Sequence, residues 1–168
     1  MWSSGSTATS SEQQKGLDNA PRRAALSFAP LRELFFSGDP VVTENELAKV
    51  VVDVAFHIHR KLGPGLLESV YHAVMVYELQ KRGLRIKSKE PVPIVWDDVR
   101  LDKGFEADVI VEDKLLLEFK SIENVPAVHK KQLLTYLRLT DLRLGLLINF
   151  GSELIKDGIF RIVNGLEE

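Results

Sequence analysis

The 168-residue chain has no cysteine, no long apolar run and no strong excess of either charge. Without cysteine it forms no disulfide, holds no metal through a thiolate and has no cysteine nucleophile. No apolar stretch approaches the ~20 residues that a membrane-spanning helix needs. The formal net charge of −2 does not provide the basic surface on which tight non-specific nucleic-acid binding usually rests. With 45% hydrophobic residues, the composition indicates a soluble cytoplasmic protein with one substantial core.

The chain divides near residue 43. Residues 1–42 are largely rich in Ser, Thr, Gln and Gly without sustained periodicity, which predicts a disordered leader. From Thr43, a capping box and apolar residues at helical spacing predict an amphipathic helix to about Leu62. A second helix is expected over residues 66–82, so the two form an αα-hairpin. Residues 43–168 are expected to form one domain.

The remainder of the chain reads mainly as strands with one further helix. Short apolar or β-branched segments are bounded by turn residues, and one stretch has helical spacing. Strands are expected at 84–89, 92–96, 99–101, 107–111, 114–120, 142–150 and 158–163, and the helix at 127–140. This order predicts an α/β fold in which helices flank a mixed sheet.

Three charged residues in one predicted hairpin form the candidate site. Side chains alternate between faces along a strand, so Glu118 and Lys120 share one face. A tight turn at Glu112 and Asp113 joins this strand to the one before it. Asp108 is therefore expected across from Glu118.

This triplet suits metal-dependent chemistry on a phosphate. Two close carboxylates repel unless a cation lies between them, and Mg²⁺ takes one or two carboxylates with waters and phosphate oxygens. Asp108 and Glu118 are thus candidate ligands for Mg²⁺ or Mn²⁺, and Lys120 would hold or deprotonate a metal-bound water. The alternative is a solvated hairpin with an ion pair that contributes under about 1 kcal/mol. The triplet alone slightly favours the solvated hairpin, because the same three residue types occur at this spacing by chance in many proteins.

Two helical positions add candidate residues. Gln132 and Tyr136 lie four apart on one helical stripe, from which they can reach a scissile phosphate or the lysine. The alternative is a polar helix edge with a half-buried tyrosine. Glu68 falls in the first turn after a Gly-Pro-Gly corner, either as a third acidic ligand or as a charge worth roughly 0.3–1 kcal/mol at a helix N-terminus. Basic runs at 81–82, 85–89 and 129–131 form either a phosphate-contacting rim or an ordinary solvated face.

Five sequence features in order resemble the GxxExxY family, which is placed in the PD-(D/E)xK nuclease superfamily. They are Gly65-x-x-Glu68-x-x-Tyr71, Ala107-Asp108, Leu117-Glu-Phe-Lys120, Gln132-Leu-Leu-Thr-Tyr136 and Leu144-Gly-Leu-Leu-Ile-Asn-Phe-Gly151. The resemblance covers about residues 44–164. It implies a restriction-endonuclease-like core.

The resemblance also implies roles for the site residues. Asp108, Glu118 and Lys120 match the nuclease-like site, and Glu68 matches an acidic residue that the superfamily often carries on its first helix. Gln132 and Tyr136 match the QxxxY element of exonuclease-like members.

The leading hypothesis is a Mg²⁺- or Mn²⁺-dependent nuclease that hydrolyses DNA or RNA phosphodiesters. Asp108 and Glu118 would bind the metal with help from Glu68, and Lys120 would orient or activate the attacking water. Two alternatives stay open: a non-catalytic module of this fold that binds nucleic acid or a protein partner, and chemistry on a small phosphorylated molecule. No membrane partner is expected, and an exposed strand at a sheet edge would allow a homodimer.

Overall fold

A five-stranded mixed sheet forms the centre of the structure, a computed structural model that describes residues 42–166. Its strand order is β1-β2-β3-β4-β5. Only the β3–β4 pair is parallel among these described strands. The strands are β1 (Ile86–Trp96), β2 (Val99–Val111), β3 (Leu115–Lys120), β4 (Leu144–Asn149) and β5 (Ile159–Val163).

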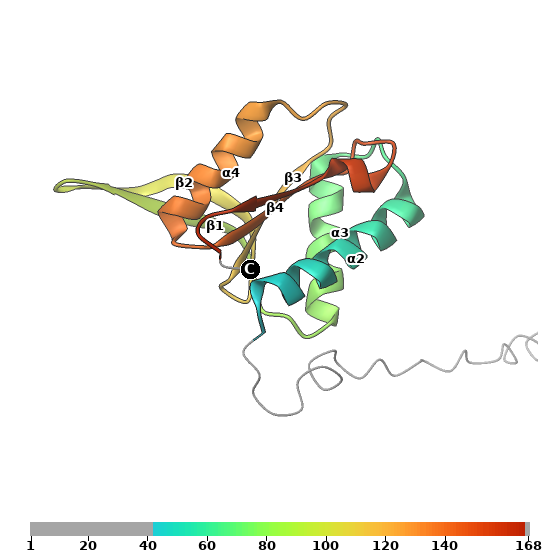
Figure 1. Cartoon of the computed structure of the whole chain (residues 1–168), viewed down its shortest axis with the longest axis horizontal. Helices are drawn as coiled ribbons and strands as arrows, with labels where there is room; N and C mark the ends of the chain where they lie inside the picture. The colour runs from blue at the N-terminus through green and yellow to red at the C-terminus, as the bar shows by residue number, and fades with distance from the viewer. Residues whose placement is uncertain (1–41, 167–168) are drawn as a thin grey trace, which may run out of the picture.

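Helices cover both faces of this sheet (Figure 1). α2 (Glu44–Leu62) and α3 (Glu68–Lys81) form the predicted αα-hairpin on one face, and α4 (Ala127–Thr140) lies on the other. Alternate residues of β3 serve the two faces: Leu117 packs in the core with α2 and α3, whereas Leu116 packs in the core with α4. The predicted mixed sheet with flanking helices is confirmed.

The central strands β3 and β4 are buried on both faces because helices cover the sheet above and below them. Every residue of β4, and every residue of β3 before Lys120, is buried. α4 makes the crossover that a parallel strand pair requires, and the leucine-rich sequences of both strands suit burial on two sides. This pair provides a rigid base for the residues at its ends.

Helix α2 begins as the sequence predicts. The Thr43 hydroxyl accepts a hydrogen bond from Glu46 N at 3.3 Å, and Thr43 N donates to Glu46 Oε2 at 2.8 Å. This reciprocal pair satisfies two backbone N–H groups that a helix start leaves free. The helix ends before Gly63, whose φ of 70° is in the left-handed region, where glycine adds no steric strain.

Strands β1 and β2 are longer than expected. Separate strands were expected at 84–89, 92–96, 99–101 and 107–111, but β1 and β2 run almost continuously through these segments. β1 accommodates Pro91 and Pro93 because it is an edge strand, where a missing N–H is tolerated. The register shifts between Val92 and Ile94.

Strands β2 and β3 form a fork. They pair only from Val109 opposite Leu117 to Val111 opposite Leu115. Beyond this point β2 continues with β1 alone, and the two project from the body as a ribbon (Figure 1). Asp108 is the β2 residue at the opening of the fork.

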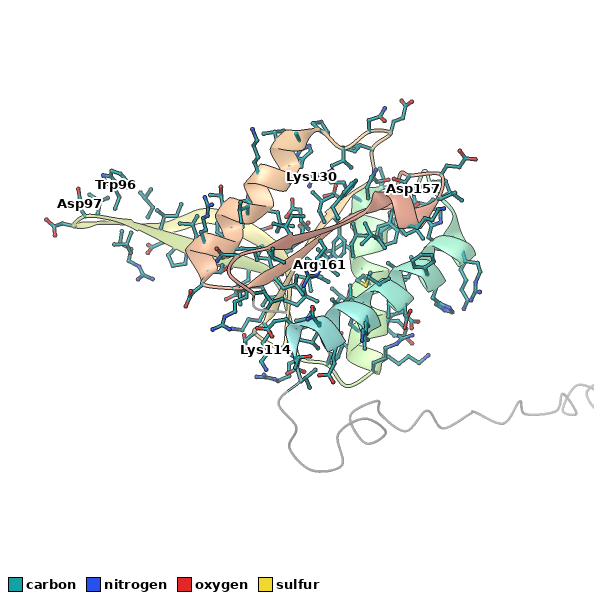
Figure 2. All side chains as sticks on the ribbon, in the orientation of Figure 1. Trp96, Asp97, Lys114, Lys130, Asp157 and Arg161 are labelled. Atoms are coloured by element: carbon teal, nitrogen blue, oxygen red, sulfur yellow. The ribbon has the colours of Figure 1, made fainter. Side chains whose placement is uncertain are left out.

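The expected leader lies almost entirely outside the described residues. Of residues 1–42, only Val42 is described; it packs against the core, and its carbonyl accepts a hydrogen bond from Lys114 Nζ at 2.6 Å (Figure 2). Within residues 42–166, no helix combines the length and apolar character needed to cross a membrane.

Candidate active site

Asp108 and Glu118 are two largely buried carboxylates at the fork. Their residues are 7% and 8% exposed. Asp108 Oδ2 accepts a hydrogen bond from Phe119 N at 2.9 Å. The aspartate thus satisfies a backbone N–H of β3 just beyond the last β2–β3 pair. The fork thus fixes Asp108 beside the strand that carries Glu118.

Lys120 completes the predicted triplet. Its Nζ donates to Glu118 Oε1 at 2.8 Å and to the Phe119 carbonyl at 2.8 Å. The same ammonium lies 4.0 Å from Glu68 Oε2. The structure therefore brings Lys120 between Glu118 on its own strand and Glu68 on α3.

Burial and neighbouring charges set the electrostatics of this triplet. Burial raises the pKa of Glu118, the hydrogen bond from Lys120 opposes that rise, and the charge of Asp108 adds to it. Burial alone would lower the pKa of Lys120, but its hydrogen bond to Glu118 and the surrounding carboxylates raise it overall. The result is a firmly charged ammonium beside a carboxylate that is harder to ionise than usual.

A second lysine, which sequence reasoning did not assign to the site, contacts Asp108. Lys89 Nζ donates to Asp108 Oδ1. The other members of its basic run pair at the nearby turn: Arg85 Nε donates to Glu112 Oε2 at 2.9 Å, and Lys87 Nζ lies 2.7 Å from Asp113 Oδ1. The run therefore forms ion pairs rather than an unpaired rim. The sequence alone does not show whether a lysine in an edge strand contacts a site carboxylate or pairs with a surface carboxylate.

The Gly-Pro-Gly corner positions Glu68, and Tyr71 holds the corner. The Tyr71 hydroxyl donates to Gly63 O at 2.7 Å and accepts from Leu66 N at 3.1 Å, while its ring stacks on Phe150 with centroids 4.4 Å apart. The hydroxyl of Ser121, next to Lys120, donates to Leu66 O at 2.7 Å. The start of α3 is thus attached to the end of β3.

His72 is another site neighbour that the sequence interpretation missed. Its Nε2 lies 3.1 Å from the Asp108 carbonyl oxygen and 3.2 Å from Ser88 Oγ. The ring also meets Phe119 edge-on, with centroids 5.7 Å apart. Its position four residues after Glu68, on the same helical stripe, was the signal that could have identified it.

Asn149 secures the backbone that follows Lys120. Its Oδ1 accepts from Ile122 N at 3.0 Å, and its Nδ2 donates to Ile122 O at 2.7 Å. Gly151 lies so close that a Cβ there would be 2.4 Å from Ile122 O, which only glycine avoids. The asparagine therefore fixes the backbone at Ile122 from the end of the neighbouring strand.

Gln132 and Tyr136 lie together on α4 but bond to each other. Gln132 Nε2 donates to the Tyr136 hydroxyl, and the Tyr136 ring stacks on Phe105 of β2 with centroids 3.8 Å apart. Burial raises the pKa of Tyr136, the hydrogen bond from Gln132 opposes this, and the charge of Glu118 adds to it. The pair thus packs against β2 through the stack of Tyr136 on Phe105.

A family model described as the PD-(D/E)XK nuclease superfamily matches residues 45–162, which include all of the residues above. The chain belongs to this superfamily. Asp108, Glu118 and Lys120 follow the order of acidic residue, acidic residue and lysine in the superfamily's name. No curated protein and no solved structure matches the chain. The narrower resemblance to the GxxExxY family stays a prediction.

The donor set at the fork suits the divalent metals that PD-(D/E)XK nucleases typically use. Asp108 and Glu118 offer carboxylate oxygens, the ligands a hard cation prefers, and the charge of Asp108 adds to the burial that raises the pKa of Glu118. In the part of the chain that the structure describes, no three His, Asp or Glu side chains lie close enough together to hold a metal ion. The role of Glu68 as a third ligand beside Asp108 and Glu118 therefore stays a prediction.

Proposed function

We propose that this PD-(D/E)XK protein is a Mg²⁺- or Mn²⁺-dependent hydrolase of nucleic-acid phosphodiester bonds. The observation that carries the proposal is the pair of largely buried carboxylates at the fork, with the Lys120 ammonium bonded to Glu118. Burying two acidic groups is unfavourable unless cations compensate them. Because a buried ion pair contributes little net stability even when it is compensated, this cluster is better explained by chemistry than by stability.

Each proposed role follows from position. Asp108 and Glu118 would hold the ion, which when bound supplies an activated water and offsets charge on the phosphate. Lys120 would stabilise negative charge that develops at the phosphate, because its ammonium is already held at the fork. Glu68, which is half-buried, would help to hold Lys120 and assist at the metal. Gln132 and Tyr136 would position the substrate.

The test is cleavage of labelled single-stranded and double-stranded DNA and RNA, each with Mg²⁺ or Mn²⁺. We expect metal-dependent cleavage by the wild-type protein and a loss of about 10²-fold or more in D108N and K120M. D113N is the matched control, because Asp113 lies in the turn of the same hairpin and pairs with surface cations. It should cleave at the wild-type rate.

Two results would contradict the proposal. Equal cleavage by wild type, D108N and K120M would assign the activity to a contaminant. No cleavage of any of the four substrates by a folded protein would favour the alternative, a non-catalytic module that uses the same fold for binding. The small-molecule alternative predicts instead that free nucleotides compete for the site while none of the four nucleic acids is cleaved.

One observation favours the binding alternative. The ribbon exposes Val95, Trp96, Val99 and Leu101, and Trp96 is 73% exposed. Figure 2 shows Trp96 and Asp97 at the far end of the ribbon, away from the body. Exposed apolar residues grouped on one element are typical of surfaces that meet a partner, which the binding alternative requires and the hydrolase does not.

A further inference from the structure

Lys89 is held at the site by an unusual backbone conformation. Its φ of 52° lies in the left-handed region, which for a residue with a Cβ costs roughly 1–2 kcal/mol. Ser88 pairs with Val109 and Glu90 pairs with Ala107, but Lys89 has no partner in the ladder between them. The irregularity falls across from Asp108, the carboxylate to which the Lys89 side chain donates.

The charges at the fork explain why a lysine is useful there. Asp108 and Glu118 are largely buried, and the Lys120 ammonium is bonded to Glu118 rather than to Asp108. Lys89 supplies the cation for Asp108.

The two lysines differ in how easily their ammonium groups can move away from the carboxylates that they contact. The Lys120 side chain is 16% exposed, whereas the Lys89 side chain is 49% exposed. Lys89 therefore approaches Asp108 from the solvent side, and its flexible four-carbon stem allows the ammonium to return to water without a change in the backbone. Lys120 lacks this route because it is enclosed by Glu118, Glu68 and the Phe119 carbonyl.

We propose that Lys89 is a built-in countercation for Asp108 that a divalent metal must displace, so that this lysine sets the metal affinity of the site. The inference rests on the proposed function, since it takes Asp108 to be a metal ligand. It assigns to Lys89 the role of a positioning residue that holds the Asp108 carboxylate in place before the metal binds. Displacement leaves the ammonium at the rim, in reach of an incoming phosphate.

The test measures Mn²⁺ binding by titration calorimetry and thermal unfolding in EDTA or saturating Mn²⁺. K89M removes the charge and keeps the length of the side chain. K87M is the matched control, two residues away on the same strand and paired with Asp113. We expect K89M to bind Mn²⁺ roughly tenfold more tightly than wild type, because a competing cation is removed, and to unfold at a lower temperature in EDTA. Saturating Mn²⁺ should reduce that difference, and K87M should match the wild type.

The outcomes separate this inference from the proposed function. One outcome overturns the role of Lys89 but not the metal site. In it, the wild type binds Mn²⁺, D108N does not, and K89M binds Mn²⁺ no more tightly than the wild type. A purely structural lysine would give that pattern, since damage to the site weakens binding. Binding by K89M where wild type shows none would support the inference. No binding by wild type, K89M or K87M would overturn both proposals.

Discussion

The β3–β4 pair and the distal ribbon belong to one sheet but differ in what surrounds them. Apolar residues of β3 and β4 are buried on both faces, whereas every residue from Val95 to Gly104 is exposed. Similar apolar side chains therefore do different things. In the central pair they hold the fold and its carboxylates, and on the ribbon they contribute no core. We expect stability to depend on the first region and not on the second.

Substitution in the central pair should have the largest effect. Phe119 is fully buried between Phe150 and His72, so F119A leaves a cavity that its neighbours cannot fill. We expect a loss of about 3–5 kcal/mol in the free energy of unfolding, measured by urea denaturation. A loss below about 1 kcal/mol would mean that the central pair is not the main source of stability.

Loss of one hydroxyl at the corner of the αα-hairpin should have a smaller effect. Y71F keeps the ring stacked on Phe150 but removes the bonds to Gly63 O and Leu66 N. We expect about 1–3 kcal/mol of destabilisation, since buried polar groups lose their partner. Y77F removes a hydroxyl from an exposed residue of the same helix and should leave the urea midpoint unchanged. Equal midpoints for the two variants would contradict the structural role of Tyr71.

One substitution inside the buried region should remove a pH dependence of stability. The pKa of Glu118 is raised above its ordinary value of 4.5, first by burial. The folded protein therefore holds this proton where the unfolded chain has lost it, and stability falls as the pH rises through the folded pKa. E118Q should lack this decline in EDTA, which urea unfolding between about pH 5 and pH 8 will detect. E123Q, at an exposed position, is the control, and parallel wild-type and E118Q profiles would refute the assignment.

Substitution on the ribbon should have the smallest effect. Trp96 is largely exposed, so W96A should change the free energy of unfolding by less than about 0.5 kcal/mol. The measurement is urea denaturation at two protein concentrations. A larger loss that grows with concentration would mean that the ribbon packs against a second copy, and it would make the predicted homodimer a source of stability.

Local patterns predicted most of the fold. The capping box located the start of α2, and helical spacing located α4 at residues 127–140. The Glu112–Asp113 turn formed as expected, with positive φ at both residues. Each of these depends on neighbours in sequence. The length of β1 could not be read in the same way, because prolines are allowed in an edge strand and edge position is a property of the whole sheet.

The sequence predicted only part of the site, because some of its contacts depend on the arrangement of the whole sheet. Strand alternation placed Glu118 and Lys120 together, and the Lys120–Glu118 bond confirms that geometry. The Lys89–Asp108 pair depends on a left-handed residue and on the fork, neither of which has a pattern in a single sequence. The expected reach of Gln132 and Tyr136 toward substrate stays a prediction.

The peptide group of Phe119 connects the site to its backbone. Its N–H donates to Asp108 and its carbonyl accepts from Lys120, so Asp108 and Lys120 are both partners of this one residue. Asparagine is a better test substitution than alanine at Asp108 for this reason, because it retains an acceptor for the buried N–H. The same amide is a natural reporter: its hydrogen–deuterium exchange follows the bond to Asp108, and an NMR signal at this single position would register occupation of the site without any substrate.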